Sequence, residues 1–256
     1  MNSMLPMFNH FQQEQFRELH SLGYNWRSVC KKWLSAKSTE KKRMDWCRSR
    51  LYWTINNQWK HIMFSYEMMI VLKPDGKLKV WRKVAEKRRP ECLGYMRECQ
   101  GSTLKLMVWG CVTYFGMGTL AFINGNMNSE KYINTLDNYL WPAVTKHYGV
   151  NRWIFQEDNA PTHKSRLCEA WKQENNIPIL LWPAKSPDLN LIENVWLLLR
   201  NKIKRSLDRI RNLDDLKTEL LNAWNNVSLH YLHNLYGSMP RRIRQVLVQK
   251  GHITKY

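Results

Sequence analysis

Two acidic residues stand where the chain could bring their carboxylates together. Asp158 ends the short apolar segment 152–158 and is followed by a loop, while Glu193 lies in the first turns of the helical segment 191–207. Ligands of α/β sheets bind beyond the carboxyl ends of strands, so both side chains could face one site. Carboxylate oxygens suit hard divalent cations such as Mg²⁺. Spacing alone leaves a second explanation open, because acidic residues near helix starts commonly cap the helix or oppose its dipole.

The segments that would position these acids alternate between strand and helix patterns. Short apolar runs typical of strands are followed by helical stretches, which places Asp158 and Glu193 after two successive strands. The strand runs cover residues 152–158 and 177–182, and the helical stretches cover residues 163–176 and 191–207.

The part of the chain from residue 59 to residue 125 is dominated by strand patterns. A Lys73-Pro74-Asp75-Gly76 turn joins the first two of these runs, because Pro fixes φ and Gly accepts positive φ. A helix follows, with Asn128 as its N-cap and Gly149 as its stop. Strands in a run followed by alternating strands and helices predict a mixed sheet with helices on its faces. The early strand runs are 59–72, 77–84, 104–116 and 118–125.

The composition points to a polyanionic partner. The 256 residues include 40 Lys and Arg against 21 Asp and Glu, a formal net charge of +19. A charge of this size favours nucleic acid, whose condensed counterions are released when phosphates are neutralised, although a merely solvated basic surface remains the alternative. The six cysteines form no CxxC pair and no zinc-like spacing, which indicates a reducing compartment. No apolar run is long enough to span a membrane, and we expect no membrane partner.

Five short motifs are spread along the chain: FSYE in the first strand, MVWGC, GNMNSEKYI, QEDNAPTH and WPAKSPDLNLIENVW. The last two contain Asp158 and Glu193, with 34 residues between these acids. Together the motifs resemble the catalytic domain of the Tc/mariner superfamily of cut-and-paste DNA transposases, and the order and spacing of the last two are the most specific part of this resemblance. The resemblance covers nearly the whole chain.

The resemblance implies an α/β, RNase H-like fold with a mixed five-stranded sheet, flanked by helices and by basic helical extensions at both ends. In such transposases three acidic residues hold two Mg²⁺ or Mn²⁺ ions that cleave DNA and transfer strands by in-line phosphoryl displacement. Carried over by position, Asp158 and Glu193 are the second and third acids, both metal ligands. The first acid, the Asp of the family's FSDE, is replaced here by Tyr66.

Tyr66 leads us to expect impaired catalysis. A phenol with an ordinary pKa of about 10 is neutral and cannot bridge two metal ions as a carboxylate does. Glu67 should not substitute for it, since successive side chains of a strand face opposite ways. We therefore expect weakened Mg²⁺ or Mn²⁺ binding and a compromised transposase. The alternative is a non-enzymatic DNA-binding or dimerisation protein, domesticated or relic, derived from a transposase.

The resemblance also implies a domain organisation and partners. Residues 1–57 correspond to a remnant of the family's helix-turn-helix region and a basic linker, and residues 58–256 to the catalytic domain with its C-terminal helices. Most of the region that reads transposon ends is expected to be missing, with only a helix near residues 12–22 remaining, so sequence-specific binding is doubtful. We expect double-stranded DNA as the partner, a homodimer, and a nuclear location.

DNA backbone contacts are predicted at two basic faces. His163 could also contact a scissile phosphate, or instead brace the loop after Asp158. The helical pattern over residues 38–53, capped by Ser38 or Thr39, carries the first face, and the helix after Glu193 carries the second. The tryptophans of the strand and helix stripes are expected in the core rather than on a base-stacking surface. The predicted DNA-binding residues are Lys41, Lys42, Arg43, Arg48, Arg50, His163, Arg200, Lys202, Lys204 and Arg205.

Overall fold

The computed structural model describes residues 21–22, 36–72 and 103–256. The chain divides into two compact units, and the elements described below all belong to the second unit, Ser35–Tyr256. The predicted turn at residues 73–76, the strand at 77–84 and nearly all of the helix at 12–22 lie outside the described residues. The strands are β1 (Ile62–Leu72), β2 (Leu104–Thr113), β3 (Gly116–Ile123) and β4 (Ile154–Gln156).

The helices begin with α2, which precedes the sheet in the chain, and end with α9 near the C-terminus. Helices α3 and α4 are joined without a break by a π-helical segment, Leu136–Leu140. The helices are α2 (Lys37–Arg48), α3 (Ser129–Thr135), α4 (Trp141–His147), α5 (Arg166–Glu174), α6 (Ile192–Arg205), α7 (Leu213–Asn225), α8 (Leu229–Gly237) and α9 (Met239–Val248).

Within the part of the chain that the structure describes, the sheet is mixed, as predicted, and has four strands in the order β3-β2-β1-β4. β1, β2 and β3 are antiparallel neighbours, and β4 runs parallel to β1. The segment expected to form a fifth strand makes a single parallel bridge, between Ile179 and Phe155. Pro178 directly precedes Ile179 and lacks the N–H that a longer parallel ladder with β4 would need to donate. Among the described residues the sheet therefore has four strands where the resemblance implied five.

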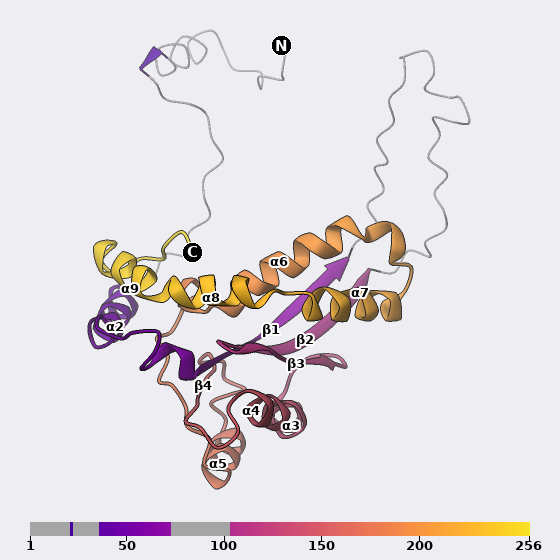
Figure 1. Ribbon diagram of the computed structural model, residues 1–256, viewed down its shortest axis with the longest axis horizontal. Helices are drawn as coiled ribbons and strands as arrows, with labels where there is room; N and C mark the ends of the chain where they lie inside the picture. Colours follow the sequence, from indigo (N-terminus) through magenta and orange to yellow (C-terminus); the bar gives the residue numbers. More distant parts are fainter. Residues whose placement is uncertain (1–20, 23–35, 73–102) are drawn as a thin grey trace. The chain divides into compact units, whose positions relative to one another are not determined.

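Helices cover both faces of the sheet (Figure 1). α6, α7 and α8 lie on one face, with α6 running along β1, while α3 and α4 lie on the other and α5 packs beside α3. α2 and α9 lie side by side at one end of the unit, although they are separated by almost the whole chain. The helix that precedes the sheet is therefore part of the compact unit.

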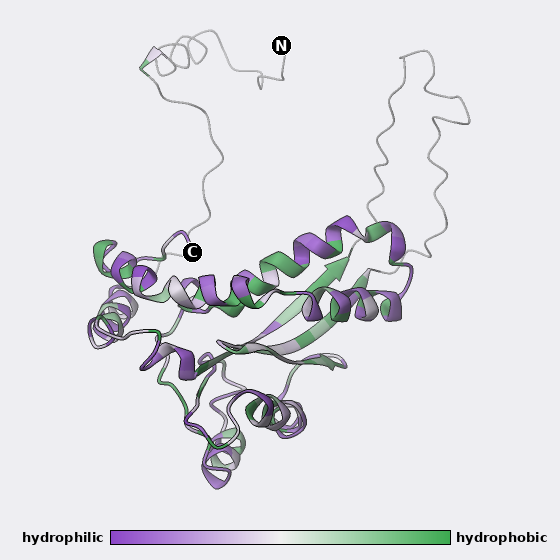
Figure 2. Cartoon of the chain, viewed as in Figure 1, coloured by the Kyte–Doolittle hydropathy of each residue, from purple (hydrophilic) through white to green (hydrophobic). Residues whose placement is uncertain are grey.

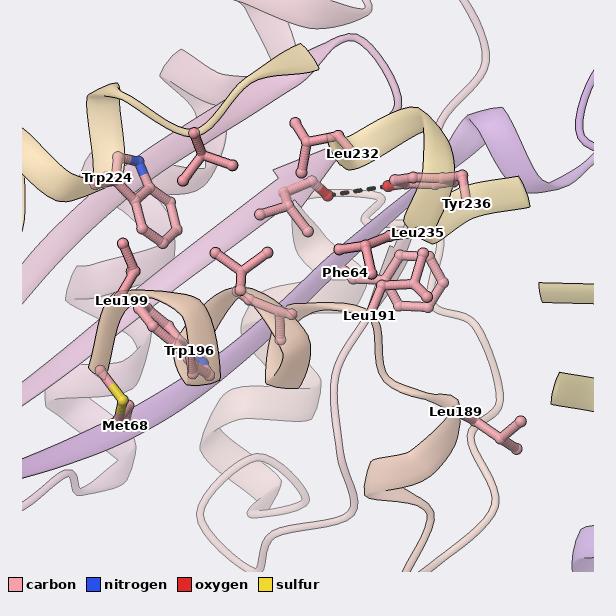
Figure 3. Close-up of a cluster of buried hydrophobic side chains, with 14 of the residues drawn as sticks. Phe64, Met68, Leu189, Leu191, Trp196, Leu199, Trp224, Leu232, Leu235 and Tyr236 are labelled. Carbon is pink, nitrogen blue, oxygen red and sulfur yellow. Dashed lines mark hydrogen bonds between the residues drawn. The ribbon is translucent and has the colours of Figure 1, made fainter. Parts of the chain in front are cut away.

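The larger core lies between the sheet and α6 to α9 (Figure 3). Alternate residues of β1, including Phe64 and Met68, face this side and meet Trp196 and Leu199 of α6. The Tyr236 hydroxyl donates hydrogen bonds to the carbonyls of Ile62 (2.7 Å) and Val112 (3.2 Å), so α8 is tied to two strands. Figure 2 shows apolar residues along the strands and polar residues alternating with apolar ones along the helices, as the sequence patterns predict.

Local sequence sets most helix boundaries. The Asn128 side chain accepts a hydrogen bond from the Lys131 N–H (2.8 Å), which confirms the predicted N-cap of α3. Gly149, with φ of 55°, follows the end of α4 as predicted. α2 instead begins at Lys37 with Ala36 before it, so the predicted cap at Ser38 or Thr39 is wrong.

Candidate active site

The register of β1 and β4 places Tyr66 beside Asp158. The last parallel pair is Phe64 with Gln156, and two further residues along each strand bring the chain to positions 66 and 158. Partners in parallel strands point to the same face, and alternate residues share that face. Tyr66 and Asp158 therefore emerge on the side of the sheet that α6 covers.

These residues meet Glu193 in one pocket, as the sequence predicted. The pocket has a volume of about 330 Å³ and its wall combines the end of β4 with the loop before α6. Glu193 enters it from the first turn of α6. The lining residues are Tyr66, Asp158, Asn159, Ala160, Trp182, Pro183, Ala184, Lys185, Ser186, Pro187, Asn190 and Glu193.

The Asp158 carboxylate is held by a backbone hydrogen bond and by an ion pair with a histidine. Its Oδ1 accepts the backbone N–H of Ala160 at 2.9 Å and lies 2.8 Å from His163 Nδ1. Burial would raise the pKa of Asp158, but the hydrogen bonds from His163 and Ala160 outweigh burial and lower it. Asp158 is therefore anionic at neutral pH and its orientation is fixed.

Glu193 is in a less favourable electrostatic environment. Burial raises its pKa, the negative charge of Asp158 adds to this effect, and Arg200 opposes it from further along α6. Two carboxylates in one pocket repel each other, and a cation bound between them would relieve the repulsion. This is the electrostatic condition for a cation site.

Tyr66 does not contribute a charge to the pocket. Burial, followed by the negative charges of Glu193, Asp158 and Glu67, raises the pKa of the phenol to about 12. The phenol is thus neutral at any physiological pH. Among the described residues, no group of three His, Cys, Asp or Glu side chains could hold a metal ion together. The pocket lining thus offers the carboxylates of Asp158 and Glu193 to a hard cation, and it has a phenol where a third carboxylate would be needed to hold a bridged pair of ions.

His163 braces the site from within and does not face solvent. Its side chain is 4% exposed, stacks on Tyr132 with ring centroids 4.0 Å apart, and places Nε2 3.1 Å from Glu67 Oε1. A buried ring cannot contact a phosphate, so the prediction that His163 binds DNA is corrected. His163 instead braces the loop after Asp158, which was the alternative. Glu67 faces the opposite side of the sheet from Tyr66, as alternation predicted, yet His163 connects it to Asp158.

A buried ion pair supports this brace. Glu157 and Lys172 are both almost fully buried and form an ion pair, and Lys172 Nζ also donates to the His163 carbonyl at 2.9 Å. The Tyr132 hydroxyl donates to the other oxygen of Glu157 at 2.7 Å. The loop after Asp158 is thus fastened to α3 and α5.

The predicted DNA-binding residues fall into two groups. Arg43 is fully buried and paired with Asp188, so its prediction as a phosphate contact is wrong. Arg50 is half-buried between the rings of Trp46 and Trp53, and half-buried Lys202 donates to carbonyls of α7 and the residue that follows it. The exposed members remain candidates: Lys41, Lys42, Arg48, Arg200, Lys204 and Arg205.

The sequence-based site omitted several pocket residues. Asn159 and Asn190 line the pocket and tie its walls together, donating to the carbonyls of Trp182 (2.8 Å) and Ser65 (3.2 Å). Lys185 is exposed at the rim and has a φ of 53°. The three pocket residues that were omitted, Asn159, Lys185 and Asn190, lie within the two motifs that contain Asp158 and Glu193, and this was the available signal.

The comparisons with known proteins agree with this geometry. A family model described as a DDE superfamily endonuclease matches residues 81–217. The Tc1 transposase of Caenorhabditis elegans is 33% identical over 247 residues, covering 94% of this chain and 86% of that protein. A Mos1 transposase paired-end complex with the left transposon end superposes with a TM-score of 0.72 at 19% identity, covering 94% of this chain and 71% of that one. The Mos1 catalytic domain with raltegravir and Mg gives a TM-score of 0.66 at 18% identity, covering 87% and 100%.

Proposed function

Because this chain belongs to the Tc1/mariner family of DNA transposases, within the DDE endonuclease superfamily, we propose that it retains the DNA-binding catalytic frame while Tyr66 impairs cleavage and strand transfer. The observation that carries the proposal is the meeting of Asp158, Glu193 and Tyr66 in one pocket. Two of the three positions supply anionic oxygen ligands, and the third supplies a neutral phenol.

Asp158 and Glu193 would hold a single Mg²⁺ or Mn²⁺ ion. The solved Mos1 catalytic domain with raltegravir contains Mg, and carboxylate oxygens suit both cations. Such an ion, when bound, polarises a phosphoryl oxygen or the attacking water or 3′-hydroxyl. His163 and Ala160 keep the Asp158 carboxylate oriented toward the pocket in the absence of the ion. Tyr66 leaves the second ion of the family's site without a bridging ligand, so weakened metal binding is part of the proposal.

The decisive experiment is calorimetric titration of Mn²⁺ into the wild-type chain and three variants, with nicking of a supercoiled plasmid scored on the same samples. The variants are Tyr66→Asp, Tyr66→Asp/Asp158→Ala and, as a matched control, Tyr66→Phe. We expect Tyr66→Asp alone to gain tight Mn²⁺ binding and nicking, because it restores the missing carboxylate. Tyr66→Phe should resemble wild type, since the phenol is neutral.

Asp158-dependent nicking by the wild-type chain would overturn the proposed impairment. Failure of Tyr66→Asp to bind Mn²⁺ would overturn the proposal that an intact frame lacks one ligand. In that case the second candidate function, DNA binding without chemistry, would be favoured by the net charge of +19 and the exposed basic side chains of α2 and α6.

Double-stranded DNA is the proposed partner, since a solved Mos1 transposase structure is a paired-end complex with the left transposon end. A homodimer and a nuclear location complete the proposal, because family transposases act on chromosomal DNA as assemblies. Sedimentation over a range of concentrations tests the dimer, and imaging of a fluorescent fusion tests the location. Within the described residues no helix has the length and apolar character to cross a membrane.

A further inference from the structure

Asp188 is a buried carboxylate in the pocket wall that does not open into the pocket. It is 1% exposed, and its neighbours Ser186, Pro187 and Asn190 line the cavity while Asp188 points away. A buried carboxylate needs strong partners to remain charged. Its partners come from segments far from the pocket in the sequence.

Arg43 of α2 supplies the main partner. Its Nη1 and Nη2 donate to the two oxygens of Asp188 at 2.9 and 2.7 Å, a bidentate pair. Nη1 also donates to Ser186 Oγ (2.6 Å) and to the Lys185 carbonyl (3.2 Å). One side chain of α2 therefore contacts three residues of the pocket wall.

The C-terminal tail completes the enclosure of Asp188. Thr254 donates from its backbone N–H (2.9 Å) and its hydroxyl (3.0 Å) to Asp188 Oδ2. Arg43 Nε donates to the Gly251 carbonyl at 2.8 Å, which ties the tail to α2. A Cβ on Gly251 would meet the Glu40 backbone, so the tail packs directly on that helix.

A second arginine extends the network to the start of α6. Buried Arg242 of α9 donates to the Asp188 carbonyl and to Asn194 Oδ1, both at 2.7 Å. Asn194 is the residue after Glu193. The same wall is held at its other end by Trp46 of α2, whose indole N–H donates to the Leu181 carbonyl at 2.5 Å.

We propose that Arg43 is a positioning residue for the pocket: through Asp188, α2 and the C-terminal tail hold the wall over residues 183–190 and so place Glu193 opposite Asp158. The proposal rests on the proposed function, because it treats Glu193 as a ligand of that site. It gives α2 a role in the site. This role could not be anticipated from the sequence, because α2 is far from Asp158 and Glu193 along the chain.

Hydrogen exchange of the full wild-type chain and of Arg43→Met tests the proposal without metal. The amides of Leu189, Asn190 and Glu193 bond within the loop, and we expect their exchange to accelerate by about tenfold or more, the effect of losing a charged hydrogen bond. Core amides of β2 exchange through global unfolding, so over the short exchange times that report on the loop they should stay protected in both proteins. The matched control is Arg48→Met, which removes an exposed arginine of the same helix.

Equal loss of protection in the loop and in β2, or none in the loop, would show that Arg43 only stabilises the whole unit and would overturn the proposal. If Arg43→Met does not fold, Arg43→Lys replaces it, since Lys keeps the charge but not the bidentate contact. For Arg43→Lys, faster exchange confined to the loop amides would support the proposal, and loop exchange at the wild-type rate would overturn it.

A second measurement connects the wall to the ligands. In the Tyr66→Asp background, adding Arg43→Met should weaken Mn²⁺ binding by about tenfold, whereas adding Arg48→Met should leave it unchanged. Unchanged affinity with Arg43→Met would overturn the positioning role. If Tyr66→Asp binds no Mn²⁺, the proposed metal frame fails, and the exchange measurement still decides whether Arg43 holds the wall.

Discussion

His163 Nδ1 lies 2.8 Å from Asp158 Oδ1, so a buried imidazole holds one of the two carboxylates of the pocket. Burial alone would lower the pKa of His163. Hydrogen bonds to Asp158 and Glu67, together with their negative charges, instead raise it to about 10. The histidine is therefore a cation throughout the physiological range and offsets part of the pocket's negative charge.

The charge on His163 makes stability depend on pH. A histidine whose pKa rises from 6.5 to about 10 on folding stabilises the protein fully below pH 6.5, and this contribution is lost as pH rises toward 10. We expect the free energy of unfolding of wild type to fall, relative to His163→Gln, by up to about 1.4 kcal/mol per pH unit in that window. Urea unfolding in EDTA at several pH values measures both proteins.

Other groups also titrate near pH 10, which is why the difference between the two proteins is the informative quantity. Parallel stability curves for wild type and His163→Gln from pH 7 to 10 would mean that the imidazole is neutral in the folded protein. A bound metal ion would compete with the proton, and EDTA removes this complication.

The ion pair of Arg43 with Asp188 should dominate the stability contributed by α2. Removing one partner of a buried pair leaves an uncompensated charge, so Arg43→Met should lower the free energy of unfolding by about 3–5 kcal/mol. Arg48→Met removes an exposed pair with Asp45 and should change stability by less than about 0.5 kcal/mol. Urea unfolding at neutral pH compares them, and a similar effect of both substitutions would contradict the assignment.

The sequence located the pocket because its residues lie at positions that local patterns determine. Tyr66 follows from strand alternation, Asp158 from the end of an apolar strand, and Glu193 from the first turn of a helix. The burial of Arg43 could not be predicted, since its partner Asp188 is 145 residues away and a basic helix face indicates exposure. His163 was ambiguous for the same reason, because its partner Glu67 is 96 residues distant.

The segment expected to form a fifth strand pairs with β4 over only one bridge, and the reason is local. Ile177–Trp182 has the apolar composition of a buried strand, and its Leu180 N–H does donate to the Phe155 carbonyl at 2.8 Å. A missing backbone donor rather than a lack of hydrophobicity limits the pairing, because Pro178 stands at a position that would donate to β4 and has no N–H. Composition predicted the location of the segment correctly but overestimated its length as a strand.

Gly251 should be far less tolerant of a side chain than Gly149. Both have positive φ, 85° and 55°, so Ala at either site carries a conformational cost of about 1–2 kcal/mol. A Cβ at Gly149 meets nothing within 4 Å, whereas one at Gly251 would lie 2.4 Å from the Glu40 carbonyl oxygen. Gly251→Ala should therefore cost about 1–3 kcal/mol more than Gly149→Ala. Thermal and urea unfolding provide the comparison, and equal costs would mean that the tail does not pack on α2.

DNA binding should depend on the exposed basic residues of α6 and not on the half-buried one. Lys204 and Arg205 are exposed at the end of α6, while Lys202 Nζ already lies 3.4 and 3.3 Å from the carbonyls of Ala223 and Asn226. If Lys204 and Arg205 each neutralise one phosphate, Lys204→Gln/Arg205→Gln should reduce the slope of log K against log salt by about 1.8. Lys202→Gln is the matched control and should leave the slope nearly unchanged. Fluorescence anisotropy with a labelled duplex at four salt concentrations gives the slopes.

An unchanged slope in the double variant would exclude this end of α6 from the DNA interface. A reduced slope in Lys202→Gln would show that the Lys202 ammonium leaves α7 to reach phosphate.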